Sequence, residues 1–125
     1  MAYRILIVDD SAVMRVMLVD MVESLGHQVA AQADTAAGAL KAFKEAKPDL
    51  VLLDVSLPDG DGLSVLREIR RASPSARVIM VTGNDQKKIR DQAIALGAKG
   101  VLCKPFDIGE LTARLSQAGA PARPA

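Results

Sequence analysis

Tryptophan is missing from this sequence, aromatic residues make up only 2% of it, and histidine and cysteine occur once each. The one cysteine, Cys103, excludes an internal disulfide, fits a reducing compartment and is expected to pack inertly on a buried strand. The one histidine, His27, follows Gly26, so we expect it at the surface with no catalytic part. Enzymes that use a histidine base to activate a nucleophile are therefore not indicated.

The sequence also lacks a large excess of either charge and a long hydrophobic run. Sixteen basic residues against fifteen acidic ones give a net charge of +1, which favours neither direct nucleic-acid binding nor an anionic membrane. The apolar runs are far shorter than the roughly 18 residues of a membrane span. The run in MAYRILIVDD ends in two acids, unlike a secretory signal. We expect a cytoplasmic protein without membrane insertion, present as a monomer or weak dimer.

What is present is the composition of one ordinary globular domain. The chain has 125 residues, of which half are hydrophobic and a quarter are charged, and this length is sufficient for a hydrophobic core. We expect one domain over residues 1–118. Residues 119–125 are rich in proline and alanine and are expected to form a disordered tail.

Short apolar runs alternate along the chain with segments of helical spacing. Four runs are continuously apolar, as in strands buried on both faces, and a weaker fifth run is a candidate edge strand. Between them, apolar residues recur every three or four positions until a glycine or proline ends the pattern. The predicted strands are 3–8, 27–32, 50–53, 77–81 and 100–103, and the predicted helices are 11–25, 35–46, 62–72, 85–96 and 107–118. This alternation predicts an α/β fold with a doubly wound parallel sheet between two layers of helices.

Polar residues follow four of the predicted strands at their carboxyl ends, where open parallel sheets collect functional groups. Asp9 and Asp10 follow the first strand, and Asp54 follows the apolar run 50–53. Thr82 and Lys104 follow the last two strands. Helix capping is the alternative for the first two acids. A lone carboxylate after so apolar a run is costly unless something pairs with it, however, and the three acids together predict a cation.

The residue types at this edge of the sheet indicate phosphoryl transfer. Carboxylates from separate strand ends form a hard-oxygen site that suits Mg²⁺. Lys104 supplies a positive charge for a phosphate, and Thr82 offers a hydroxyl group to a phosphoryl oxygen. Because a carboxylate can itself act as a nucleophile and form an acyl phosphate, the pattern indicates phosphoryl transfer to an aspartate.

Four motifs stand in order along the chain: IVDDSAVMR, LVLLDVSLPDGDGL, VTG and KPF. In this order and spacing they resemble the receiver domain of two-component response regulators, in particular chemotaxis-type single-domain receivers, over about residues 3–118. The resemblance implies the flavodoxin-like receiver fold, with five helices and a five-stranded sheet of order 2-1-3-4-5. It also implies that the chain is a signalling protein with self-phosphorylation and autophosphatase chemistry, not a conventional enzyme.

The resemblance assigns roles to the residues at the acidic edge. Asp54 matches the phosphoacceptor, and Asp9 and Asp10 match the acidic pair that positions Mg²⁺. The metal would also contact Asp54 and the backbone carbonyl of Ser56. Thr82 matches the switch hydroxyl and Lys104 the lysine of the family, with a cis peptide expected before Pro105.

Two positions depart from the family pattern. Val101 stands where the family often has a tyrosine or phenylalanine that rotates inward on phosphorylation, and Gly83 stands where alanine is common. Because glycine loosens a loop, our hypothesis is that phosphorylation orders the loop after Thr82. Ser56 and Asn84 flank the expected path of the hydrolytic water and should tune the rate of dephosphorylation.

The resemblance also implies partners. A histidine kinase or a histidine phosphotransfer protein would supply the phosphoryl group and dock on the helix 11–25. Val13, Val16 and Met17 of that helix are otherwise explained by burial alone. A downstream protein would bind the surface formed by residues 85–96, 100–103 and 107–118. The sequence contains no effector segment, so we expect output through protein contact or onward phosphotransfer.

Three other interpretations remain open at this stage. Residues 57–68 nearly fit a calcium loop, with Asp59 and Asp61 at ligand positions, although turn chemistry explains this segment better. A flavodoxin-like electron carrier would share the fold, but two acids after the first strand would repel a flavin phosphate. The third interpretation is a receiver-like interaction module that works without phosphorylation. It remains open because Val101 replaces the aromatic switch residue.

Overall fold

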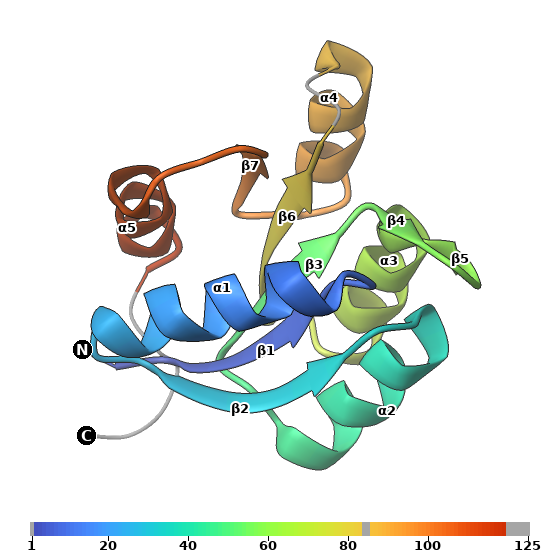
Figure 1. Cartoon of the computed structure of the whole chain (residues 1–125). Coiled ribbons are helices and arrows are strands. Elements are labelled where there is room, and N and C mark those ends of the chain that lie inside the picture. Colours follow the sequence, from blue (N-terminus) through green and yellow to red (C-terminus); the bar gives the residue numbers. More distant parts are fainter. Residues whose placement is uncertain (1, 84–85, 120–125) are drawn as a thin grey trace.

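The computed structural model describes residues 2–83 and 86–119, which form a parallel sheet flanked by helices (Figure 1). Residues 120–125 of the expected tail therefore lie outside the described part. In chain order the elements are β1 (Arg4–Val8), α1 (Ala12–Ser24), β2 (Gln28–Ala33), α2 (Ala36–Ala46), β3 (Leu50–Asp54), β4 (Ser56–Leu57), β5 (Gly60–Asp61), α3 (Gly62–Ala72), β6 (Arg77–Thr82), α4 (Lys87–Ala95), β7 (Gly100–Cys103) and α5 (Ile108–Gln117).

The main sheet has the order β2-β1-β3-β6-β7, and all its strand pairs are parallel. The small hairpin β4–β5 takes two numbers, so this is the expected order 2-1-3-4-5, and the predicted α/β fold is confirmed. β2 lies at an edge of the sheet, as its weaker apolar pattern predicted. Because β1 and β3 are neighbours and Val8 pairs with Leu53, Asp9, which follows β1, lies beside Asp54, which ends β3.

Helices cover both faces of the sheet. α1 and α5 lie on one face, and α2, α3 and α4 lie on the other (Figure 1). Leu18 and Val22 of α1 pack with Leu111 and Leu115 of α5 over one side of the strands. Val65, Leu66 and Ile69 of α3 pack on the opposite side. Since side chains on both faces of the central strands are buried, the strand sequences are continuously apolar.

Side-chain caps begin most of the helices. Ser11, Thr35, Asp61 and Asp107 each accept a hydrogen bond from a backbone N–H in the first turn of α1, α2, α3 and α5. Caps of this kind satisfy amide groups that have no partner within the helix. The helix boundaries are thus encoded locally, which explains why the sequence located them within one or two residues.

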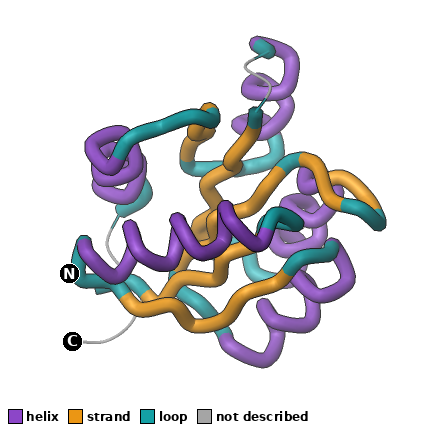
Figure 2. The backbone as a smooth tube through the Cα atoms, viewed as in Figure 1, coloured by secondary structure: helices purple, strands orange, loops and turns teal. Residues whose placement is uncertain are grey.

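The hairpin β4–β5 is the feature of the fold that the sequence did not predict. The segment was expected to be a turn, but Ser56 pairs with Asp61 and Leu57 with Gly60 in two short antiparallel strands. Figure 2 shows this hairpin projecting from the end of β3 beside the start of α2. Its strands have two residues each, too few for an alternating apolar pattern.

The single histidine and cysteine are both half-buried. The Nδ1 atom of His27 accepts a hydrogen bond from the backbone N–H of Tyr3 at 3.0 Å, a structural contact that the sequence did not predict. Among the described helices, none is long and apolar enough to cross a membrane.

Candidate functional site

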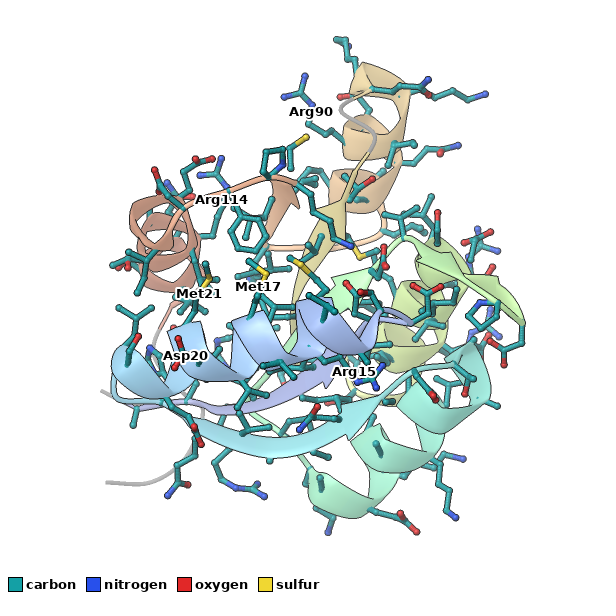
Figure 3. All side chains as sticks on the ribbon, viewed as in Figure 1. Arg15, Met17, Asp20, Met21, Arg90 and Arg114 are labelled. Atoms are coloured by element: carbon teal, nitrogen blue, oxygen red, sulfur yellow. The ribbon has the colours of Figure 1, made fainter. Side chains whose placement is uncertain are left out.

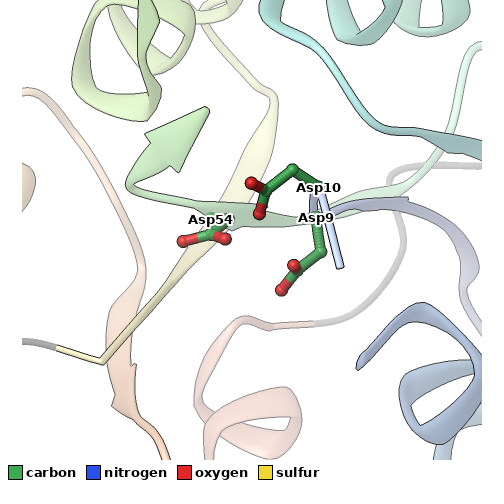
Figure 4. A group of neighbouring side chains, drawn as sticks. All are labelled: Asp9, Asp10 and Asp54. Carbon is green, nitrogen blue, oxygen red and sulfur yellow. The ribbon is translucent and has the colours of Figure 1, made fainter. Parts of the chain in front are cut away.

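Three carboxylates meet at the carboxyl ends of β1 and β3. Oxygen atoms of Asp9, Asp10 and Asp54 all lie within 4.8 Å of one another (Figure 4). Asp9 is fully buried and Asp54 is 5% exposed, whereas Asp10 is open to solvent. The sheet order brings these acids together, because β1 and β3 are adjacent although they are separated by α1, β2 and α2 along the chain.

A lysine from the far end of the chain enters the same cluster. The Nζ atom of Lys104 lies 2.9 Å from Oδ2 of Asp9 and 3.4 Å from Oδ2 of Asp54. The backbone N–H of Lys104 donates to the carbonyl of Thr82 at 2.7 Å. The Lys104–Pro105 peptide is cis. Four of the residues singled out in the sequence are therefore joined by direct contacts.

Burial and charge shift the pKa values of the cluster. Burial raises the pKa of Asp54, and the charge of Asp9 adds to this effect, while Lys104 and the N–H of Ser56 oppose it. Burial alone would lower the pKa of Lys104, but the hydrogen bond to Asp9 and the charges of both carboxylates outweigh it and raise that pKa. The ammonium group is therefore held in its charged form beside the acids.

The backbone around Asp9 is fixed by three hydrogen bonds. Its N–H donates to the carbonyl of Ala33 at 3.1 Å, and its Oδ1 accepts from the N–H of Ser11 at 2.9 Å. Its carbonyl accepts from the guanidinium group of Arg15 at 2.7 Å. Arg15 was not predicted as part of the site, because nothing in a lone arginine on a helix indicates which carbonyl it will reach.

Gly62 is packed against the backbone of Asp54. A Cβ atom at Gly62 would lie 2.0 Å from the carbonyl oxygen of Asp54, far closer than real contacts allow. The N–H of Gly62 donates to the carbonyl of Val55 at 2.6 Å. Only a residue without a side chain fits here, so the glycine is part of what orients Asp54.

The expected switch positions lie on β6 and β7. Thr82 is 3% exposed and ends β6, and Gly83 follows it in an exposed bend. Val101 is half-buried on β7, and its carbonyl accepts a hydrogen bond from Nε of Arg114 on α5 at 3.1 Å. Asn84, expected beside the hydrolytic water, lies outside the described residues.

The donor set suits a magnesium ion. Three carboxylates supply hard oxygen ligands, and the exposed side of Asp10 leaves space for the water molecules that Mg²⁺ retains. Asp59 and Asp61, the acids of the calcium-loop alternative, instead accept hydrogen bonds from the first turns of α2 and α3. The cation site that the geometry supports is therefore the one at Asp9, Asp10 and Asp54.

An apolar groove lies next to the acidic cluster. It is lined by Met14, Met17, Met21, Lys104, Pro105 and Phe106. Figure 3 shows Met17 and Met21 pointing from α1 toward the side of α5. Val13 and Val16 of α1 are 72% and 69% exposed, so these two valines are not explained by burial in the core.

Comparison with known proteins places this geometry in a family. Residues 5–116 match the model of the response regulator receiver domain. The chain therefore belongs to the response regulator receiver family, as the four sequence motifs indicated.

Within that family the chain is similar to chemotaxis proteins. It is 43% identical to the chemotaxis protein CheY of Bacillus subtilis over 106 residues, which cover 85% of this chain and 88% of that protein. It is 36% identical to CheY of Thermotoga maritima over 117 residues, 94% of this chain and 98% of that protein. The predicted likeness to chemotaxis receivers is confirmed.

Solved structures agree with these relatives. A chain in the crystal structure of the CheX-CheY-BeF3-Mg²⁺ complex from Borrelia burgdorferi matches with a TM-score of 0.88 and 29% identity, over 90% of this chain and 86% of that chain. The response regulator domain of Thermotoga maritima CheB matches with a TM-score of 0.87 and 31% identity, over 94% of this chain and 96% of that domain.

Proposed function

We propose that this receiver takes a phosphoryl group from a phosphohistidine donor onto Asp54, with Mg²⁺ bound at the acidic cluster, and later loses the group by hydrolysis. The observation that carries the proposal is the position of Asp54, which lies 3.4 Å from the ammonium group of Lys104 and beside two further carboxylates. The donor would be a histidine kinase or a histidine phosphotransfer protein, in the cytoplasm.

The chemistry follows from the groups around Asp54. A carboxylate oxygen attacks the phosphorus atom of the donor, the P–N bond breaks, and its electron pair returns to the imidazole nitrogen, which takes a proton from solvent. Lys104 is charged and offers its ammonium group to a phosphoryl oxygen. Mg²⁺, held by Asp9, Asp10, Asp54 and the backbone carbonyl of Ser56, would supply positive charge to the transferring group.

Hydrolysis ends the signal. A water molecule attacks the phosphorus atom, the bond to the Asp54 oxygen breaks, and inorganic phosphate leaves as the carboxylate is restored. Ser56 and Asn84 are proposed to flank the path of this water. Replacing either with an acid or a base is expected to change the rate at which phosphorylated protein decays.

Output is proposed to pass through Thr82 to the surface formed by α4, β7 and α5, where a downstream protein binds. The support is the hydrogen bond from Lys104 N–H to the Thr82 carbonyl, which joins the ends of β6 and β7. Arg114 adds a second link, between α5 and β7, because its Nε donates a hydrogen bond to the carbonyl of Val101. A displacement of Thr82 would reach α5 through β7 without an aromatic residue at position 101.

Mass spectrometry tests the phosphoacceptor. After incubation with acetyl phosphate and Mg²⁺, wild-type protein is expected to gain about 80 Da, the mass of one phosphoryl group. Asp54→Asn is expected to gain nothing, and Asp20→Asn, which alters an exposed acid on α1, should gain as much as wild type. An unmodified wild-type protein would reject the proposal, and a modified Asp54→Asn would reject Asp54 as the acceptor.

The exposed apolar residues of α1 are proposed to receive the donor protein. Val16→Asp puts a charge where an apolar surface would be covered. The variant is expected to slow transfer from a histidine phosphotransfer protein and to leave the reaction with acetyl phosphate unchanged, because the small donor needs no docking surface. Equal slowing of both reactions would place the defect in the site and reject docking on α1.

A further inference from the structure

Asp59 lies at the turn of the hairpin β4–β5 and binds a helix that is distant in sequence. Its Oδ1 accepts a hydrogen bond from the N–H of Ala36 at 2.6 Å, and its Oδ2 accepts from the N–H of Ala37 at 3.1 Å. Ala36 and Ala37 form the first turn of α2, 23 and 22 residues away along the chain. We call this contact between Asp59 and the two alanine amides the Asp59 clasp.

The clasp is not a substitute for a missing helix cap. α2 already has its own cap, because Thr35 Oγ1 accepts from the N–H of Gly38 at 2.9 Å. α3, the helix that follows the hairpin, is capped by Asp61. Asp59 therefore ties the hairpin to a neighbouring element, and the hairpin backbone comes close enough that a Cβ atom on Gly60 would lie 3.7 Å from that of Ala36.

Both segments that the clasp joins, the hairpin and the start of α2, are close in sequence to residues that hydrogen-bond to the acidic cluster. On the hairpin side, Asp59 lies three residues beyond Ser56, whose N–H donates to Oδ1 of Asp54 at 3.2 Å. On the helix side, α2 follows β2, whose last residue, Ala33, accepts the N–H of Asp9 at 3.1 Å. The clasp thus closes a ring of contacts around the carboxyl ends of β1, β2 and β3.

We propose that Asp59 is a positioning residue for the cation site, which holds the segment of Ser56 in place relative to Asp9 and Asp54. This proposal rests on the proposed function, because the site it positions is the proposed magnesium site. The two alanine amides lower the pKa of Asp59, so its side chain is an ionised carboxylate at neutral pH and can accept both hydrogen bonds.

Amide exchange in metal-free protein is the first test. Asp59→Ala removes the clasp, and we expect the amides of Ser56, Ala36 and Ala37 to exchange faster than in wild type. Thr35→Val is the matched control, because it removes a hydrogen bond from the same helix start without touching the hairpin. It should speed exchange at Gly38 and leave Ser56 at the wild-type rate. If Ser56 exchanges equally fast in Asp59→Ala and wild type, the clasp is only a helix cap and the proposal is wrong.

Magnesium affinity is the second test, measured by titration of the same variants with MgCl₂. Asp59→Ala is expected to bind Mg²⁺ at least about threefold more weakly, a modest effect for a residue that orients metal ligands. The loss should persist at about 1 M ionic strength, where simple attraction by an exposed charge is screened. A loss that disappears at high salt would show that Asp59 acts through its charge alone and would overturn positioning.

The two proposals fail separately. If wild-type protein binds no Mg²⁺, the proposed function is wrong, while the exchange rate of Ser56 still decides whether Asp59 holds the hairpin. If wild type binds Mg²⁺ and Asp59→Ala binds it equally well, the proposed function stands and Asp59 is not a positioning residue.

Discussion

The ammonium group of Lys104 lies 2.9 Å from a carboxylate oxygen of Asp9, a contact between residues 95 positions apart in the sequence. Asp9 is fully buried, whereas the side chain of Lys104 is 25% exposed. A buried carboxylate is costly without a charged partner. The contact therefore stabilises the folded chain in addition to setting the charge of the cluster.

Removing the ammonium group should destabilise the protein. Lys104→Gln leaves a buried carboxylate without its cation, and we expect the free energy of unfolding to fall by about 2 kcal/mol. This is less than for a fully buried pair, because Lys104 is partly solvated. Urea denaturation at neutral pH measures the change.

A second lysine supplies the control. Lys87 lies 2.7 Å from Asp91 on α4, but these two side chains are 83% and 62% exposed. Lys87→Gln is expected to cost less than about 0.5 kcal/mol. If both variants lose equally little, the contact between Lys104 and Asp9 does not stabilise the fold.

A side chain at position 62 should disturb the site. Gly62→Ala forces a methyl group into the carbonyl of Asp54, and overpacking of this kind costs on the order of 1–3 kcal/mol. Thermal unfolding should show the loss, and the reaction with acetyl phosphate should slow because Asp54 is displaced. Gly83→Ala is the control for stability, since no atom of the described residues other than its chain neighbours lies within 4 Å of a Cβ there. Equal melting temperatures of the two variants would contradict the prediction.

Magnesium should stabilise the folded protein. A ligand that binds only the native state adds about 2.7 kcal/mol to the free energy of unfolding at a concentration 100 times its Kd. The melting temperature should therefore rise steadily as the MgCl₂ concentration is increased. Asp10→Asn is expected to weaken the response without harming the fold, because Asp10 is exposed. Asp20→Asn should respond like wild type. An equal response in all three proteins would exclude Asp10 as a ligand.

The stability of the protein should depend on the protonation of His27. Its Nδ1 atom accepts the N–H of Tyr3 at 3.0 Å, and burial lowers its pKa below the usual 6.5. The folded state therefore binds fewer protons than the unfolded state between these two pKa values. Stability is complete above the unfolded pKa and falls as the pH drops toward the folded one.

Denaturation at pH 7.5, 6.5 and 5.5 measures this dependence. His27→Gln does not titrate and should lose less stability over the same range. Arg4 and Glu23 line the same shallow pocket as His27 and are present in both proteins. Parallel curves for wild type and His27→Gln would show that other groups cause any decline.

The sequence predicted the strands and helices well because their signals are local. The run from Leu50 to Leu53 is apolar without interruption, and its burial on both faces in β3 explains why. Helix starts were located by capping residues such as Asp107, whose carboxylate accepts the N–H of Glu110 at 2.8 Å. The order of the strands, in contrast, came from the resemblance to receivers, since no local pattern states which strands pair.

The contacts that the sequence did not reveal are hydrogen bonds in which a side chain of one element reaches the backbone of another. Asp59 appeared as a turn residue or calcium ligand, and its hydrogen bonds to α2 depend on how the hairpin lies in space. The hydrogen bond from Arg15 to the carbonyl of Asp9 likewise depends on how α1 lies relative to the end of β1. At Val101 the sequence showed that an aromatic residue is missing, but the link to Arg114 required the packing of α5 on β7.

The order in which the chain is translated gives the position of Lys104 one more consequence. Asp9, Asp10 and Asp54 leave the ribosome well before Lys104, and the Tyr3 hydroxyl donates to the carbonyl of Leu115, 112 residues later. A nascent chain therefore exposes its acids without their cation until β7 has been synthesised and has joined the sheet. The charge balance of the site is completed only after Lys104, which directly follows β7, has been synthesised, so a chain that stops before β7 would keep the acids and lack their counter-charge.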